Sequence, residues 1–177
     1  MAEAGLDGFE RNSALAAAVA EWRSWLAYEK RASPHTISAY SRDLGGFLSF
    51  LQGHLGQPPR LTDLETLTAA DFRAWMARRA SDGASRSSIA RAMSVLRGFF
   101  KWLEREGHGS NHAIRAMRSP RQPAGIPKPL TLADADLLLD SVDLLPGEPW
   151  ETQRDLALFT LLYGCGLRIS EALQLNR

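Results

Sequence analysis

The strongest constraint on the fold of this chain is an apolar stripe that recurs every three or four residues. That period is typical of an α-helix with one buried face, and no segment alternates apolar and polar residues as a half-buried strand would. The stripe predicts a helix over residues 13–29, and Ser33-Pro34 then supplies an N-cap followed by proline at the first helical position of a second helix. We therefore expect an all-α fold for the residues present.

Breaks and capping residues predict further helices. Serine or threonine followed three residues later by an acidic residue satisfies two backbone donors at a helix start, and glycine often ends a helix. The second helix is expected to end before Gly53, a third to begin at the capping box Thr68–Asp71, and a fourth to run from Ser85 or Ser87 to Gly107. Further along, we expect a helix after the capping box Thr131–Asp134, a helix over 152–163 and a helical start at Leu167.

A proline-rich segment predicts the domain organisation. Residues 118–129 hold four prolines and one glycine, which is the composition of an extended, semi-rigid linker. We predict a helical domain over residues 1–117, a basic linker over 118–129, and an incomplete domain over 130–177 that resembles the start of a larger one.

The composition excludes several classes of protein. One cysteine rules out a disulfide framework and a cysteine-built zinc site, and Cys165, between two glycines, is expected to be a packed thiol. His108 and His112 are predicted to lie in a surface loop, and no glycine-rich loop precedes a lysine, so we expect no metal and no cofactor. No segment approaches the ~20 apolar residues of a membrane span, and the sequence predicts a soluble, cytoplasmic protein.

The formal net charge of +1 hides an asymmetry along the chain. Residues 1–126 carry 17 basic and 12 acidic side chains, whereas residues 127–177 carry 4 and 8. Within the first part, residues 84–121 carry eight basic side chains against two acidic ones. Such a cluster of basic side chains is typical of a surface that faces phosphates. A helix face that is merely solvated would explain the charge equally well.

Polar residues of the second and fourth helices are the candidate DNA-binding residues. On the fourth helix, Ala90, Ser94, Arg97, Lys101 and Arg105 are predicted to share the face opposite the apolar stripe. Small residues would let a duplex approach closely, and serines at the helix starts offer phosphate donors or serve only as N-caps. The full candidate set is Ser33, His35, Thr36, Arg42, Ser87, Ser88, Arg91, Ser94, Arg97, Lys101, Arg118, Arg121 and Lys128.

The string Tyr163-Gly-Cys-Gly-Leu-Arg168-Ile-Ser-Glu171-Ala-Leu closely resembles the first catalytic-arginine motif of the tyrosine recombinases, the lambda-integrase superfamily. Upstream, residues 33–44 resemble the start of the core-binding domain of that family, and residues 87–103 resemble its fourth helix. Residues 111–130 resemble the Xer branch, and its XerC group more than its XerD group. The chain is therefore identified as a member of this family.

The resemblance implies a helical SAM-like core-binding domain, followed by the first helices of an α+β catalytic domain, with both closing around DNA as a clamp. The implied chemistry is DNA cleavage and rejoining through a 3′-phosphotyrosine, without metal or cofactor. In the Xer branch this implies chromosome dimer resolution at a dif-like site, a XerD-like partner recombinase in a heterotetramer, and a DNA translocase.

At the positions that match the motif, Arg168 is the first catalytic arginine, and its planar fork suits two phosphate oxygens. The resemblance implies that Glu171 orients the site. The alternative interpretation is that Arg168 and Glu171 only form an ion pair between residues three positions apart on a helix.

The family also requires a lysine on a β-hairpin, a His-x-x-Arg motif, a further histidine or tryptophan, and a C-terminal tyrosine nucleophile. We expect none of these here. Tyr28, Tyr40 and Tyr163 match helices of the core-binding domain and of the start of the catalytic domain, not the nucleophile, and Tyr163 is expected to pack. The sequence therefore predicts a truncated recombinase that binds DNA and does not cut it. Two alternatives stay open: a stand-alone DNA-binding or regulatory module without recombination chemistry, and a helical protein-interaction domain with a merely solvated basic face.

Overall fold

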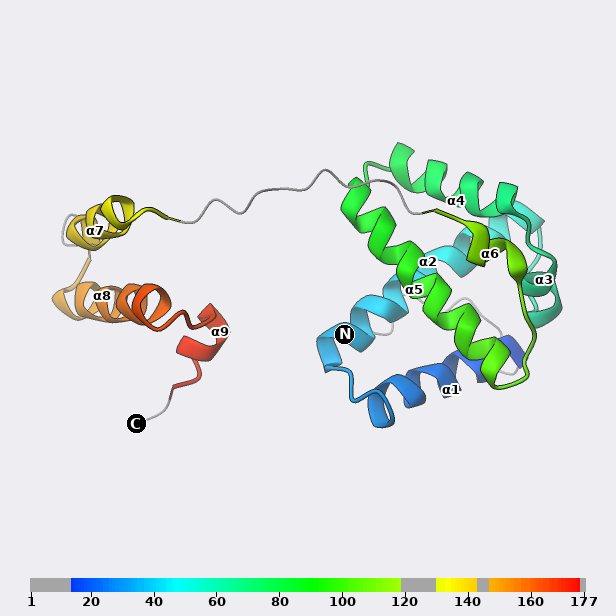
Figure 1. The fold of residues 1–177 in the computed structure, drawn as a ribbon, viewed down its shortest axis with the longest axis horizontal. Coiled ribbons are helices and arrows are strands. Elements are labelled where there is room, and N and C mark those ends of the chain that lie inside the picture. The colour runs from blue at the N-terminus through cyan, green and yellow to red at the C-terminus, as the bar shows by residue number, and fades with distance from the viewer. Residues whose placement is uncertain (1–13, 119–129, 143–146, 176–177) are drawn as a thin grey trace. The chain divides into compact units, whose positions relative to one another are not determined.

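A computed structural model of the chain describes residues 14–118, 130–142 and 147–175 (Figure 1). The chain divides into two compact units, residues 1–123 and 124–177. The described residues form helices joined by turns and contain no strand, which confirms the all-α prediction. Residues 119–129 of the predicted linker lie outside the described residues, and the proposed domain limits stay a prediction.

The described part of the first unit consists of α1 (Ala14–Tyr28), α2 (Pro34–Leu55), α3 (Leu61–Thr66), α4 (Ala69–Ser81), α5 (Arg86–Arg105) and α6 (His112–Ala116). The described part of the second unit consists of α7 (Leu132–Ser141), α8 (Pro149–Gly164) and α9 (Ile169–Ala172).

Capping residues set most of these helix starts, as the sequence predicts. Ser85 is the N-cap of α5, and its Oγ accepts a hydrogen bond from the backbone N–H of Ser88 at 3.1 Å. Asp71 accepts from the backbone N–H and the hydroxyl of Thr68, both at 2.7 Å, and so closes the predicted capping box of α4. The backbone hydrogen bond from Thr68 is the main reason that the pKa of Asp71 lies below its usual value.

Three helix boundaries differ from the prediction. Helix α2 continues past Gly53 and ends at Gly56, whose φ of 70° lies in the left-handed region that glycine adopts without strain. Helix α8 begins at Pro149, before the expected residue 152, because Glu148 and Glu151 form a capping box there. Helix α9 begins at Ile169 and not at Leu167. Two short helices were not predicted: α3, which has six residues and the unusual N-cap Arg60, and α6, whose first residue His112 was expected in a surface loop.

Helix α5 is the centre of the first unit. It contacts α1, α2, α4 and α6, and it buries ten of its residues between Ile89 and Leu103. Aromatic rings fill the space between α5 and its neighbours. The fully buried Phe47 of α2 lies 5.7 Å from Phe72, 5.3 Å from Trp75 and 6.4 Å from Phe100, measured between ring centroids.

A buried amide joins α3 to α6. The Asn111 side chain donates hydrogen bonds to the carbonyl oxygens of Leu64 at 2.9 Å and Leu67 at 2.8 Å. Its Oδ1 accepts from the backbone N–H of Ile114 at 3.0 Å and so caps α6. The single side chain therefore satisfies backbone groups of both short helices.

The second unit, described by itself, exposes much of its apolar surface. Helix α8 has no buried residue, and Trp150 and Tyr163 on it are both exposed. Cys165 is exposed as well, so the prediction that it is a packed thiol is wrong. It follows the last turn of α8, where no described helix covers it. Packing was also expected for Tyr163, and its exposure shows that this prediction is wrong. Of the other two tyrosines, Tyr28 is 82% exposed and Tyr40 is partly buried beside Trp22.

No helix in the described ranges combines the length and the apolar character that crossing a membrane requires.

We expect Phe47→Ala to lower the free energy of unfolding by about 3–5 kcal/mol, because it removes a ring packed against three other rings and leaves a cavity. Urea denaturation followed by far-ultraviolet circular dichroism measures this change. Tyr28→Ala is the matched control, with an expected change within about 0.5 kcal/mol, since the Tyr28 ring is exposed. Equal losses in both variants would contradict this description of the core.

Candidate nucleic-acid interface

One side of α5 is exposed along the whole helix. It consists of six residues spaced three or four apart, which we call the α5 stripe: Ser87, Arg91, Ser94, Gly98, Lys101 and Arg105. The stripe holds no acidic residue and three basic ones, so it presents positive charge along one line of the helix.

The α5 stripe is rotated relative to the predicted polar face. Ala90, expected on that face, is buried at 7% exposure, and Arg97 is half-buried. The cause is that α5 packs against four helices. Together they cover a wider arc of its surface than one neighbouring helix would. Arg97 also donates a hydrogen bond from Nη2 to the carbonyl oxygen of Met117 at 2.7 Å, so it holds the end of α6.

The start of α2 carries a second group of candidates. Ser33 is the N-cap, and its Oγ accepts from the backbone N–H of Thr36 at 3.2 Å. His35 is exposed in the first turn, and Arg42 is exposed further along the helix. At the start of α5, the hydroxyls of Ser87 and Ser88 contact the Ser85 Oγ at 2.9 and 3.0 Å. Ser33 and Ser85 are therefore N-caps, and the Ser87 and Ser88 hydroxyls contact the second of them.

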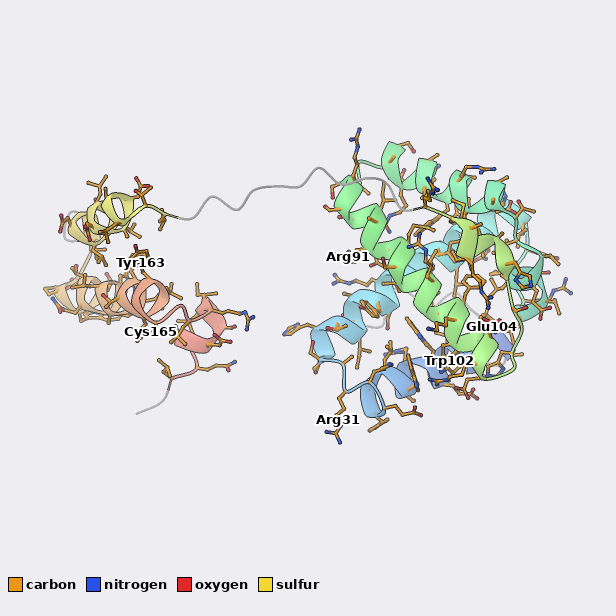
Figure 2. The ribbon with its side chains drawn as sticks, viewed as in Figure 1. Arg31, Arg91, Trp102, Glu104, Tyr163 and Cys165 are labelled. Atoms are coloured by element: carbon orange, nitrogen blue, oxygen red, sulfur yellow. The ribbon has the colours of Figure 1, made fainter. Side chains whose placement is uncertain are left out.

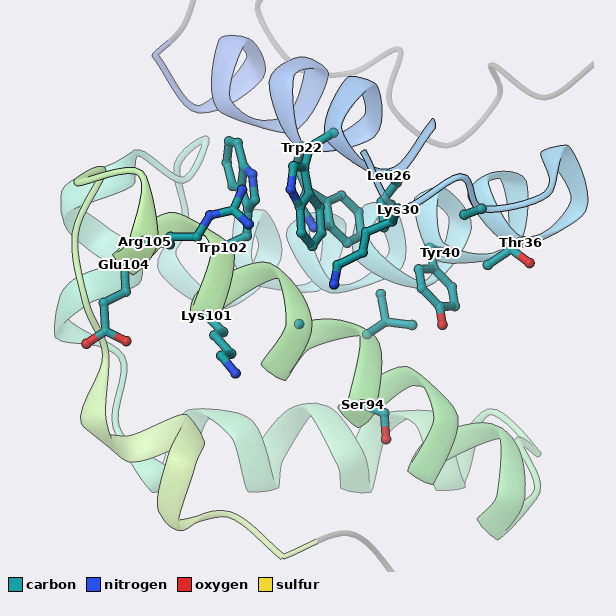
Figure 3. Close-up of a pocket in the computed structure, with 14 residues that line it drawn as sticks. Trp22, Leu26, Lys30, Thr36, Tyr40, Ser94, Lys101, Trp102, Glu104 and Arg105 are labelled. Atoms are coloured by element: carbon teal, nitrogen blue, oxygen red, sulfur yellow. The ribbon is translucent and has the colours of Figure 1, made fainter. Parts of the chain in front are cut away.

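A pocket of about 700 Å³ lies between α1, α2 and α5 (Figure 3). Three of the predicted DNA-binding residues, Thr36, Ser94 and Lys101, line it. Figure 3 shows Lys101 and Ser94 projecting from α5 and Lys30 reaching toward the pocket from the end of α1. The remaining lining is mainly aromatic and basic, with Trp22, Trp25, Tyr40, Trp102 and Arg105, and one acidic residue, Glu104. The structure therefore brings the start of α2 and the middle of the α5 stripe to one concave surface.

Two cations lie over the indole ring of Trp25 at the edge of this pocket. The Nζ of Lys30 is 5.2 Å and the Cζ of Arg105 is 4.6 Å from the ring centroid. Arg105 also pairs with Glu106 at 2.6 Å. These contacts fix the positions of two positive charges next to the pocket.

The sequence-based candidates did not include Lys30 and Arg31, which are separated from the N-cap of α2 by Ala32. Arg31 has a φ of 49°, in the left-handed region that a non-glycine residue adopts at a cost. Its side chain is exposed beside the first turn of α2. The available signal was a pair of consecutive basic residues separated by one position from a capping serine.

Not all of the basic residues that produce the local charge are available to a ligand. Arg115 forms an ion pair with Glu104, whereas Arg91, which pairs with Asp43 through Nε, keeps a side chain that is more than half exposed. Lys101 takes part in none of the hydrogen bonds or ion pairs within the described residues. Arg118 is exposed after α6, whereas Arg121 and Lys128 lie outside the described residues.

In the second unit, the two residues of the arginine motif contact each other. Arg168 is the N-cap of α9, and its Nη1 donates to Glu171 Oε1 at 3.0 Å. Glu171 Oε2 in turn accepts from the backbone N–H of Arg168 at 2.8 Å. The Arg168 side chain is 84% exposed, so most of its guanidinium donors face solvent.

The expectation that the chain holds no His-x-x-Arg string needs one correction. His112-Ala-Ile-Arg115 has this spacing, but it forms α6 in the first unit and precedes Arg168 in the chain. His108 is not a free loop residue either, because its Nε2 lies 3.2 Å from Glu21 Oε2 and its ring packs against Trp102. Within the described ranges, no three His, Cys, Asp or Glu side chains gather as metal ligands would.

Comparison with known proteins gives two results. Residues 19–107 match the family described as phage integrase, N-terminal SAM-like domain. Proteins named tyrosine recombinase XerC are similar over most of the chain: that of Rhodospirillum centenum is 48% identical over 170 residues, which is 96% of this chain and 50% of the relative.

The tyrosine recombinase XerC of Brucella suis is 45% identical over 162 residues, which is 92% of this chain and 51% of the relative. That of Rhizobium meliloti is 46% identical over 161 residues, which is 89% of this chain and 51% of the relative. The chain thus spans about half the length of these relatives. No solved structure matches it.

We expect Gly98→Ala to raise the free energy of unfolding by about 0.5–1 kcal/mol. Glycine is a poor helix former, and a Cβ added at position 98 meets no atom within 4 Å. Urea denaturation measures the change, with Ser94→Ala as the control at a neighbouring exposed position of the α5 stripe. A loss of stability in Gly98→Ala would show that this part of the stripe is covered in solution.

Proposed function

We propose a function from one premise: this chain belongs to the phage integrase family of tyrosine recombinases, whose N-terminal SAM-like domain its residues 19–107 match. The proposed function of the first unit is to bind duplex DNA through the α5 stripe and the start of α2. We further propose that the chain is the DNA-binding portion of a XerC-like site-specific recombinase, as its similarity to proteins of that name supports.

The observation that carries the proposal is the composition of the α5 stripe together with its exposure. Its basic residues are Arg91, Lys101 and Arg105, and the small residues Ser94 and Gly98 stand between the first two. An α-helix fits the major groove of B-DNA, and basic and hydroxyl side chains are the usual partners of phosphate oxygens. The small residues Ser94 and Gly98 leave room for a close approach to the duplex.

The start of α2 supports the same interpretation. Ser33, His35 and Thr36 lie in its first turn, where the helix dipole and unpaired backbone N–H groups favour an anion. Thr36 lines the same pocket as Ser94 and Lys101, so one ligand can reach both helices. A protein-interaction surface would not need this combination of two polar helix starts and an acid-free stripe.

The finer proposals concern the whole recombinase. We propose that Arg168 contacts the scissile phosphate, with Glu171 orienting it, since the exposed guanidinium can form two hydrogen bonds to phosphate oxygens. A dif-like DNA site, a XerD-like partner in a heterotetramer and a DNA translocase belong to the same proposal, and the similarity to XerC proteins supports them only as family-typical features. The alternative is a DNA-binding or regulatory module without recombination chemistry.

We expect Lys101→Ala to weaken binding of the chain to a duplex about three- to tenfold at low salt. It should also reduce the slope of log K against log[salt] by ~0.9, the effect of one lost phosphate contact. Fluorescence anisotropy of a labelled duplex over a series of salt concentrations measures both quantities. Arg73→Ala, which removes an exposed cation from α4, is the matched control and should change neither.

Equal effects of Lys101→Ala and Arg73→Ala would mean that net charge, and not the α5 stripe, determines binding. Absence of any salt-sensitive binding by the wild-type chain would contradict the proposed function and favour the protein-interaction alternative.

We expect the 177-residue chain to form no covalent adduct with DNA. Arg168 can hold a phosphate, but it provides neither a nucleophile nor an acid for the leaving 5′-oxygen. The measurement is denaturing electrophoresis of a labelled, nicked duplex after incubation with the chain. A protein–DNA band that disappears in Tyr163→Phe would contradict this expectation and would identify Tyr163, which is exposed, as a nucleophile.

A further inference from the structure

Helix α2 buries a carboxylate that the proposed function has not yet used. Asp43 is only 4% exposed, and an acidic side chain is rarely buried to this extent unless it is paired. Its Oδ2 accepts a hydrogen bond from Nε of Arg91 on α5 at 3.2 Å. Its Oδ1 lies 3.7 Å from Nη2 of Arg79 on α4. One carboxylate therefore joins three helices through two arginines.

The two arginines differ in their surroundings. Arg79 is mostly buried, its guanidinium lies 5.7 Å from the Trp75 ring centroid, and its Nε has no hydrogen-bond partner among the described residues. Among the described ion pairs, Asp43 is the only acidic partner of Arg79. Arg79 thus neutralises the carboxylate from the inner side, so that Asp43 does not leave an uncompensated negative charge beside the α5 stripe.

Arg91 instead faces outward. Its side chain is 57% exposed, and it belongs to the α5 stripe between Ser87 and Ser94 (Figure 2). It contacts Asp43 through Nε, and the described contacts leave its two terminal nitrogens without a protein partner. Those nitrogens are the ones that form a fork suited to two phosphate oxygens. A long, flexible side chain is thereby fixed before it meets a ligand.

We propose that Asp43 is a positioning residue for DNA binding: it holds the guanidinium of Arg91 so that the terminal nitrogens meet a phosphate, and it does not contact DNA itself. This inference rests on the proposed function. It assigns a binding role to a buried residue on α2 through a contact with a residue 48 positions further along the chain.

The test is a double-mutant cycle on duplex binding by the full chain, measured by fluorescence anisotropy. Asp43→Asn in the wild-type background should weaken binding about three- to tenfold, and Arg91→Ala should do the same. In the Arg91→Ala background, Asp43→Asn should weaken binding less than about twofold, because the residue through which it acts is gone. Asp63→Asn, which alters the exposed Arg60–Asp63 pair on α3, is the matched control and should leave binding unchanged in both backgrounds.

An equal effect of Asp43→Asn in both backgrounds, or no effect in the wild-type background, would overturn the inference. Because the loss of a buried charge can prevent folding, circular dichroism must show that each variant is folded. If Asp43→Asn does not fold, Asp43→Glu decides the question, because it keeps the buried charge and displaces the carboxylate from Arg91 Nε. It should weaken binding in the wild-type background and not in the Arg91→Ala background, and wild-type affinity would overturn the inference.

The inference and the proposed function can fail separately. A wild-type chain that does not bind the duplex contradicts the proposed function. A wild-type chain that binds, is weakened by Arg91→Ala and is unaffected by Asp43→Asn contradicts only the role of Asp43.

Discussion

The burial of a wide face of α5 is the interaction on which the rest of the first unit depends. Ten residues of α5 are buried, and α1, α2, α4 and α6 all contact this helix. Most of the stability of a helix in a protein comes from packing of its apolar face, so the core around Phe47 and Phe100 stabilises these helices. The same packing leaves the α5 stripe exposed, together with Arg86 and Glu104 at the two ends of the helix. The core therefore determines which side chains a ligand can reach, and it holds them on a rigid helix.

Charge in the sequence and charge at the surface are different quantities in this protein. Eight basic residues stand against two acidic ones over residues 84–121, but the fold gives Arg97 a carbonyl partner and pairs Arg115 with Glu104. Surface pairs of this kind add little stability. Their effect is to decide which cations remain for a phosphate. Lys101 remains, and Arg91 keeps its terminal nitrogens while Asp43 holds its Nε.

Local signals made part of this structure predictable from sequence. The N-cap Ser33 and the capping boxes at Thr68 and Thr131 depend on residues within one turn, and the structure confirms all three. The rotated face of α5 could not be predicted, because the burial of Ala90 depends on several helices at once. The Asp43–Arg91 contact was also out of reach, since nothing local links residues 48 positions apart. The residues proposed to bind DNA, including the Arg168 motif, came from spacing and resemblance, and they stay a prediction.

The measurement that tests the central claim most directly is amide chemical-shift mapping of the full chain during titration with a duplex. We expect the largest changes in the first turns of α2 and along the α5 stripe from Ser87 to Lys101, where exposed side chains of two helices line one concave surface. Smaller changes at Asp43 would accompany them, because it contacts Arg91. Changes concentrated on α3 or on the outer side of α4, with the α5 stripe unaffected, would contradict the account.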